Sequence, residues 1–180
     1  MERPAYLILH GYQGSGPGHW QSWLAGRLRS GDATVRFPDL PDADAPRPQL
    51  WLEALERELD AFSEQPVVIC HSLACLLWMH HAAHGGKAAA RLLLVAPPSQ
   101  TGAPEILHPF FPVPRVEFEN ARLVCSDNDP FCPEGAASLY PGLPTDILPG
   151  AGHINPDAGY GPWPAVEAWA RDGATPVTGQ

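Results

Sequence analysis

The chain has 180 residues, with 20 acidic against 11 basic side chains and a net charge of −9 at pH 7. This length indicates one domain that buries roughly 70% of its unfolded surface, while the negative charge, without a cluster of lysine and arginine, argues against nucleic acid and anionic membranes as partners. No apolar run reaches the length of a signal-peptide core or a membrane-spanning helix, so we expect a cytoplasmic protein.

Strand-like and helix-like segments alternate along the chain. Short apolar runs predict six strands, at residues 5–9, 34–37, 66–70, 91–96, 121–125 and 145–148. Helical patterns between them predict helices at residues 18–29, 48–62, 73–84, 134–140 and 163–171. This alternation predicts an α/β fold with a doubly wound, mostly parallel sheet of strand order 2-1-3-4-5-6 that binds ligands where the third strand ends. We expect residues 1–171 to form this domain and residues 172–180, rich in Gly, Thr and Pro, to form a mobile tail.

The loop after the first strand begins with His10 and Gly11 and contains further glycines. In α/β-hydrolases a strand that ends in His-Gly, with flexible backbone after it, supplies one of the N–H groups that bind the oxyanion. The N–H of Tyr12 or that of Gln13 could fill this role, and the sequence does not choose between them. The second donor would be the N–H of Leu73.

Ser72 lies between the apolar run at residues 66–69 and the helical run at residues 73–79. This layout is typical of a nucleophile elbow, in which a tight strand-to-helix turn exposes the serine hydroxyl at the helix N-terminus. The alternative is an ordinary helix N-cap serine. An elbow needs small residues two positions before and after the serine, and Cys70 and Ala74 occupy these positions in place of the usual glycines.

Two later loops carry the partners that a serine nucleophile needs. The fifth predicted strand is followed by Asp127 and Asp129, and the sixth is followed by His153. The order Ser, Asp, His is that of the α/β-hydrolase triad and differs from the orders in chymotrypsin and subtilisin. Of the eight histidines only His153 follows the last strand, whereas His71 adjoins the serine but points elsewhere on an elbow.

These motifs together resemble the small serine hydrolases grouped with retinoblastoma-binding protein nine and bacterial YdeN, a branch of the α/β-hydrolase superfamily. The resemblance rests on residues 10–11, 16–21, 70–74, 126–133, 152–155 and 161–164. It implies a triad of Ser72, Asp129 and His153, because Asp129 takes the acid position in the family's Asp-Asn-Asp-Pro block, and it leaves Asp127 to brace the loop. It also raises the prospect of amide hydrolysis, since some relatives are described as aminopeptidases.

The connection at residues 97–120 stands where larger α/β-hydrolases insert a lid. It is rich in proline and too short for a cap domain, so we expect a shallow, open site. Phe110 and Phe111 in this connection either line an apolar substrate pocket or seal the edge of the sheet.

We expect no cofactor and no metal, because the four cysteines lack the spacing of metal ligands. The favoured prediction is a serine hydrolase that acts on small carboxylic esters through an acyl-enzyme, with an amide or aminopeptidase substrate as the alternative. A further alternative is a binding module of the same fold with little turnover. Residues 123–127 approximate an L-x-C-x-E pocket-protein motif, but they fall mostly in a predicted buried strand, so a protein partner is unsupported.

Overall fold

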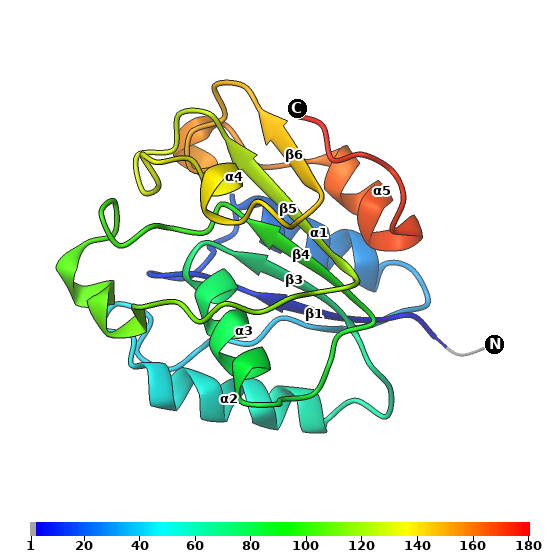
Figure 1. Cartoon of the computed structure of the whole chain (residues 1–180). Helices are drawn as coiled ribbons and strands as arrows, with labels where there is room; N and C mark the ends of the chain where they lie inside the picture. The colour runs from blue at the N-terminus through cyan, green and yellow to red at the C-terminus, as the bar shows by residue number, and fades with distance from the viewer. Residues whose placement is uncertain (1–2) are drawn as a thin grey trace.

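The computed structural model describes residues 3–180, which form one six-stranded sheet with helices on both faces (Figure 1). The strand order is β2-β1-β3-β4-β5-β6. The strands are β1 (Ala5–Leu9), β2 (Thr34–Arg36), β3 (Val67–His71), β4 (Arg91–Val95), β5 (Ala121–Ser126) and β6 (Thr145–Leu148). All neighbouring pairs are parallel, so the predicted fold and strand order are confirmed and the sheet is entirely parallel.

The helices lie close to their predicted positions. They are α1 (Trp20–Arg29), α2 (Pro48–Asp60), α3 (Leu73–Ala83), α4 (Ala136–Leu139) and α5 (Pro164–Asp172). Two short 3-10 helices, η1 (Glu105–Phe110) and η2 (Pro156–Ala158), were not predicted. Each contains proline and is too short to show an apolar period, so the sequence carries no helical signal there.

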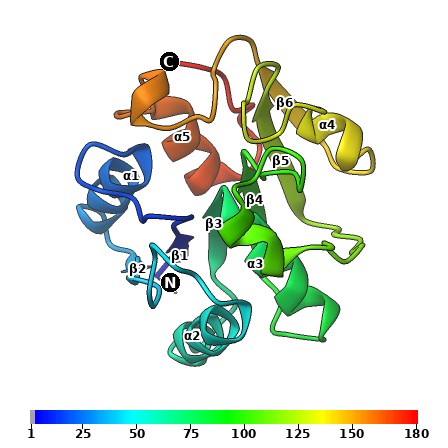
Figure 2. The same ribbon diagram turned by 90° about the vertical axis from the view of Figure 1, so that its left-hand side faces the viewer.

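Two apolar layers cover the sheet because successive side chains of a strand point to opposite faces. Ile8 and Ile69 pack with α1 and α5, while Leu7 and Val68 pack with α2, α3 and α4. Figure 2, which views the molecule along the strands, shows α1 and α5 on one side of the sheet and α2 and α3 on the other. Both faces are therefore buried, as a parallel sheet requires.

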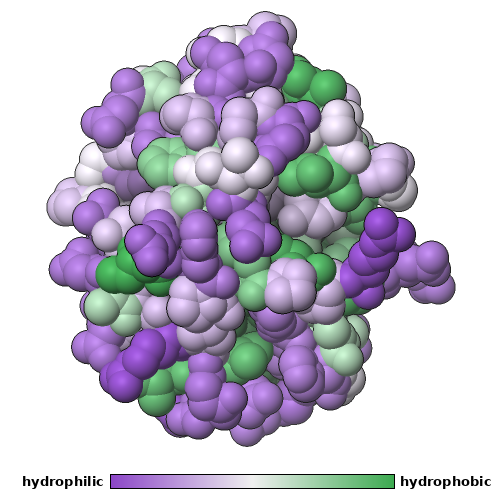
Figure 3. Space-filling model, turned by 60° about the vertical axis from the view of Figure 1, so that its left-hand side comes forward, coloured by the Kyte–Doolittle hydropathy of each residue, from purple (hydrophilic) through white to green (hydrophobic). Residues whose placement is uncertain are grey.

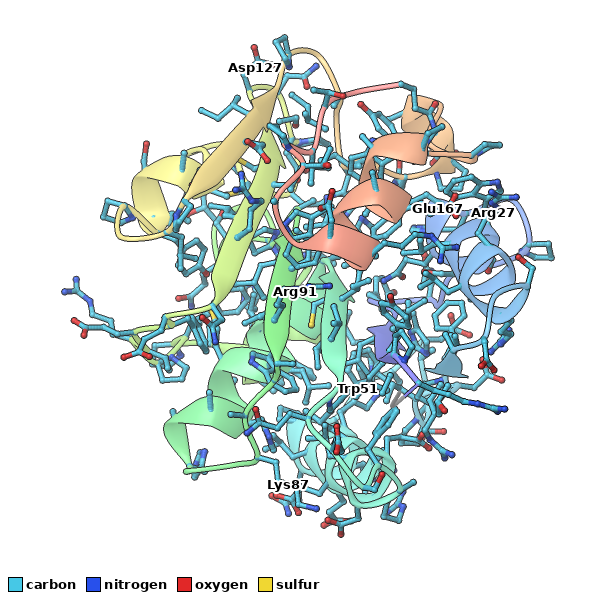
Figure 4. The ribbon with its side chains drawn as sticks, turned by 90° about the vertical axis from the view of Figure 1, so that its right-hand side faces the viewer. Arg27, Trp51, Lys87, Arg91, Asp127 and Glu167 are labelled. Atoms are coloured by element: carbon cyan, nitrogen blue, oxygen red, sulfur yellow. The ribbon has the colours of Figure 1, made fainter. Side chains whose placement is uncertain are left out.

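The reversal of winding lies between β1 and β3. The chain leaves β1 toward α1 on one face and leaves β3 toward α3 on the other face (Figure 2). At this switch point the loops that follow two neighbouring strands diverge, which leaves room for a ligand at the carboxyl ends of the strands. Figure 4 views the opposite side, where Arg27 of α1 and Glu167 of α5 form an ion pair of 3.0 Å.

The last residues of the chain pack against the domain, which differs from the expected mobile tail. Val177 is 1% exposed, and its N–H donates to a carboxylate oxygen of Asp146 in β6. The indole N–H of Trp163 donates to the carbonyl of Thr178. The tail contains few apolar residues, but one buried valine and hydrogen bonds to distant partners hold this segment. Within residues 3–180, no helix has the length and apolarity to cross a bilayer.

Candidate active site

Ser72 sits on a sharp turn between β3 and α3. Its backbone angles, φ 56° and ψ −122°, lie in a region that non-glycine residues rarely occupy. Its N–H donates to the carbonyl of Val95 at 2.8 Å, which ties the turn to the neighbouring strand. Ser72 stands at the N-cap position of α3, but its hydroxyl makes no capping hydrogen bond. The geometry is therefore that of an elbow, and the hydroxyl remains available for another partner.

The imidazole of His153 is that partner. Its Nε2 accepts from the hydroxyl of Ser72 at 2.8 Å, while its Nδ1 donates to the carboxylate of Asp129 at 2.9 and 3.0 Å. Asp129 follows β5 and His153 follows β6, so the parallel strands bring together side chains that are far apart in the sequence. All three residues are buried: Ser72 is 7% exposed, Asp129 is 5% exposed and His153 is 9% exposed. This burial shields their hydrogen bonds from competing water.

Asp127, the other candidate acid in the loop after β5, binds the loop that carries His153. The carboxylate of Asp127 accepts from the N–H of Gly150 at 2.7 Å, and the side chain of Asn128 accepts from the N–H of Gly152 at 2.8 Å. The hydroxyl of Ser126 donates to the carbonyl of Gly152. Asp127 thus braces the loop that carries His153, as expected, and Asp129 is the residue in contact with the imidazole.

The backbone after β1 lies against the elbow. A Cβ atom built on Gly11 would lie 2.9 Å from the Cβ of Ser72 and 3.0 Å from the carbonyl oxygen of His71. Only glycine allows this approach, which brings the next residue, Tyr12, beside the start of α3. The N–H of Gly14 donates to the carbonyl of Gly11 at 3.1 Å and closes a turn.

The candidate oxyanion donors differ in their availability. The N–H of Gln13 donates to the carbonyl of Ala43 at 2.9 Å and is therefore occupied. The N–H of Tyr12 makes no hydrogen bond within the described residues 3–180. Leu73 is the first residue of α3, where backbone N–H groups have no partner within the helix.

Several histidine and aromatic rings surround the imidazole of His153. Between ring centroids, Phe131 lies 4.4 Å from it and His71 lies 5.1 Å from it, and His19 meets His71 edge to face at 4.8 Å. His71 points away from the hydroxyl of Ser72, as expected, but its Nε2 donates to the backbone carbonyl of His153 at 3.0 Å. Burial, together with the nearby imidazoles, holds the pKa of His71 well below its ordinary value and lowers the pKa of His19 to about 4. No local pattern indicates this contact, because it joins residues 82 positions apart.

The comparisons with known proteins agree with this architecture. The model of the serine hydrolase family matches residues 6–171. The chain belongs to the serine hydrolase family. YdeN of Bacillus subtilis strain 168 is 32% identical over 75 residues, a segment that covers 42% of this serine hydrolase and 39% of YdeN.

Solved structures with low sequence identity share the fold of this serine hydrolase. The ydeN gene product of B. subtilis superposes with a TM-score of 0.76 at 22% identity, covering 92% of this chain and 95% of the other. A YdeN-like hydrolase from Pectobacterium atrosepticum gives 0.73 at 23% identity, with coverage of 93% and 90%. A monoacylglycerol lipase from Paleococcus ferrophilus gives 0.67 at 13% identity, with coverage of 93% and 95%. The predicted α/β-hydrolase fold is thereby confirmed.

The connection between β4 and β5 in this serine hydrolase forms η1 and then returns to the sheet. Phe110 is fully buried against Trp51 of α2, with ring centroids 5.7 Å apart, and its carbonyl accepts from Nε2 of His80 at 2.8 Å. Phe110 therefore belongs to the core, which favours the sealing role, while Phe111 is partly exposed and packs on the same core. Across residues 3–180 no cluster of three His, Cys, Asp or Glu side chains is placed to hold a metal ion.

Proposed function

We propose that this chain cleaves small carboxylic esters through an acyl-enzyme formed on Ser72. The observation that carries the proposal is the continuous hydrogen-bond chain from the hydroxyl of Ser72 through His153 to Asp129, placed at an elbow at the switch point of the sheet. A binding module has no need of these three side chains in one hydrogen-bond chain, so the arrangement favours an enzyme.

The geometry assigns a role to each group. The Oγ of Ser72 attacks the ester carbonyl as its proton passes to Nε2 of His153, and the imidazolium then delivers that proton to the departing alcohol. Asp129 accepts from Nδ1 of His153, which fixes the tautomer with a lone pair on Nε2 and stabilises the charged ring. Water then attacks the acyl carbon as His153 takes its proton, the bond from the acyl carbon to Oγ of Ser72 breaks to release the acid, and the imidazolium returns the proton to Oγ.

The oxyanion that forms in each step requires two donors. We assign the N–H groups of Tyr12 and Leu73, because Gln13 already donates to Ala43. This proposal favours Tyr12 over Gln13, the two alternatives that the sequence left open. It also gives the close approach of Gly11 to Ser72 a function, since that contact carries Tyr12 to the elbow.

The surroundings of the site favour a small substrate. Each buried methylene contributes about 0.8 kcal/mol, so an enzyme gains from a long acyl chain only where it offers a continuous apolar groove. Phe110 of the β4–β5 connection, a side chain that could have lined such a groove, lies in the core. On the side toward which the strands point, Figure 3 shows hydrophobic residues as separate patches among hydrophilic ones. We therefore expect kcat/KM to peak at short acyl chains.

A fluorophosphonate probe tests the nucleophile directly. The native protein is expected to become labelled on Ser72, and Ser72→Ala to lose both labelling and esterase activity. Ser138→Ala, in the short helix α4, is the matched control and is expected to behave as the native protein. Labelling that persists in Ser72→Ala, or a folded native protein that never labels, would contradict the proposal and favour the binding module.

A substrate panel then separates ester from amide hydrolysis. Nitrophenyl esters from acetate to palmitate, with phenylalanine nitroanilide beside them, measure chain-length preference and bond preference in one experiment. A maximum of kcat/KM at acetate or butyrate agrees with the proposal. A maximum at twelve carbons or longer would contradict the proposal, because it would show that the site buries the added methylenes, each of which contributes about 0.8 kcal/mol. A preference for the anilide would identify an aminopeptidase-like enzyme.

A further inference from the structure

We propose that His71 is a positioning residue for the base: the hydrogen bond from its Nε2–H to the carbonyl oxygen of His153 sets the separation between the base and Ser72. This inference rests on the proposed function, in which His153 is the base. It assigns His71 no contact with the substrate.

The chemistry of the contact fixes the state of His71. A carbonyl oxygen can only accept, so the proton of the ring lies on Nε2, which is 3.0 Å from the carbonyl oxygen of His153. His71 is 5% exposed. Its pKa, lowered chiefly by burial, leaves the ring neutral at pH 7, so that the contact is an ordinary hydrogen bond without a charge. A neutral ring also avoids repulsion with the imidazolium that forms on His153 during the reaction.

The donor of this hydrogen bond, His71, is the residue directly before the nucleophile, Ser72. His71 is the last residue of β3 and pairs with Val95 of β4, and the next residue, Ser72, donates its N–H to the same Val95. The donor of one hydrogen bond and the nucleophile therefore share one rigid anchor in the centre of the sheet. From this anchor, His71 holds the backbone of His153 while Ser72 donates to its ring at 2.8 Å. Two adjacent residues, His71 and Ser72, therefore both hydrogen-bond to His153, one to its backbone and the other to its ring.

The loop that carries His153 needs such a restraint. Both neighbours of His153 have positive φ values, 55° at Gly152 and 49° at Ile154, so the backbone follows an unusual path on either side of the base. Other side chains hold the flanking groups: Asn128 binds the N–H of Gly152, and Trp20 donates to the carbonyl of Ile154 at 2.9 Å. Within residues 3–180, His71 is the side chain that holds the carbonyl of His153 itself.

Three variants separate positioning from simple packing. His71→Leu removes the donor and keeps an apolar side chain, whereas His71→Gln keeps an N–H donor near the position of Nε2. His81→Leu is the matched control. His81 is also buried, at 3% exposed, and its Nε2 also donates to a backbone carbonyl at 3.0 Å, that of Lys87, but it lies in the last turn of α3.

Kinetics with p-nitrophenyl acetate and thermal melting give the first readout. A displacement of about 1 Å at a reacting pair costs roughly 100-fold, so we expect kcat of His71→Leu to fall by roughly 10- to 100-fold with KM changed by less than about twofold. His71→Gln is expected to recover most of this loss. His81→Leu is expected to melt at a lower temperature, as His71→Leu does, but to keep the native kcat.

Crystal structures of the same variants give a second readout that needs no turnover. In His71→Leu, the distance from Oγ of Ser72 to Nε2 of His153 is expected to exceed about 3.5 Å, the limit of a hydrogen bond, while the other two variants keep the native contact. A native distance and native kcat in a folded His71→Leu, or no recovery in His71→Gln, would overturn the inference. If the native protein neither labels nor turns over esters, the proposed function fails, and the distance alone then decides the role of His71.

Discussion

Gly11→Ala is the substitution that tests most directly how closely the β1 loop must approach the elbow. The added methyl would lie 2.9 Å from the Cβ of Ser72, 3.0 Å from the carbonyl oxygen of His71 and 3.3 Å from the backbone nitrogen of Leu73. These neighbours are backbone atoms or the first atom of a side chain, so they cannot rotate aside. The loop and the elbow must therefore separate by several tenths of an ångström, a change that overpacked sites accept at a cost of about 1–3 kcal/mol.

The same displacement would move the N–H of Tyr12 away from the position proposed for the oxyanion. Complete loss of one such donor costs about 3 kcal/mol, or roughly 100- to 1000-fold in kcat. Partial displacement is expected to cost less, so we expect kcat/KM of Gly11→Ala toward p-nitrophenyl acetate to fall by about 10- to 100-fold. The melting temperature should fall by a few degrees in the same variant, in proportion to the overpacking.

Gly16→Ala provides the control on the same loop. A Cβ on Gly16 meets nothing within 4 Å, and its φ is not in the left-handed region, so the added methyl is expected to leave both activity and stability unchanged. A Gly11→Ala enzyme with kcat/KM within about twofold of that of Gly16→Ala would refute the proposed role of this contact, because the loop would then have moved without displacing an oxyanion donor.

Three further predictions concern the acid, the buried histidines and the C-terminus. Asp129→Asn should cut kcat by roughly ten-thousandfold by favouring the wrong tautomer of His153, whereas Asp127→Asn should cost far less; the reverse ranking in steady-state kinetics would assign the acid to Asp127. The pKa of His19 falls from 6.5 to about 4 on folding, so between these two pH values the unfolded chain binds one more proton than the folded chain. The free energy of unfolding should therefore be unaffected by His19 above about pH 6.5 and lower by about 2 kcal/mol at pH 5. Urea unfolding at pH 7 and pH 5 measures this, and His19→Asn, which keeps an oxygen for the helix cap, should lose less on acidification; an equal loss would contradict the assignment. Val177→Ser should lower the free energy of unfolding by about 1–3 kcal/mol, whereas a freely mobile tail would give no change.

The regular elements could be predicted because their sequences carry a period. The stripe of α2 and the apolar runs of the central strands each repeat over several residues, and their observed ends lie within about two residues of the predicted ones, a normal uncertainty for such boundaries. The turns η1 and η2 are set by proline and by contacts with distant side chains, such as that of His80 with Phe110. No local pattern records such contacts.

Some features of the site could be predicted from local sequence, whereas others depend on contacts between distant residues. Ser72, Asp129 and His153 could be predicted as candidates because each follows a strand of a parallel sheet, and such strands all end at one edge. The choice between Tyr12 and Gln13 depends on the carbonyl of Ala43, about thirty residues further along, which only the folded backbone brings to Gln13. The tail likewise depends on distant partners in β6 and before α5 rather than on its own composition.

The reactivity of the four buried cysteines can report local unfolding of the protein. All four are free and buried, and burial raises the pKa of each thiol, to about 11 for Cys132. Since only an exposed thiolate reacts quickly, a maleimide or disulfide reagent meets almost no reactive thiol on the folded protein. Cys75 lies in α3, directly behind the elbow, so the rate at which its thiol reacts reports how often that helix leaves the sheet. Opening of the site region can thus be timed without a substrate, an inhibitor or an added probe residue.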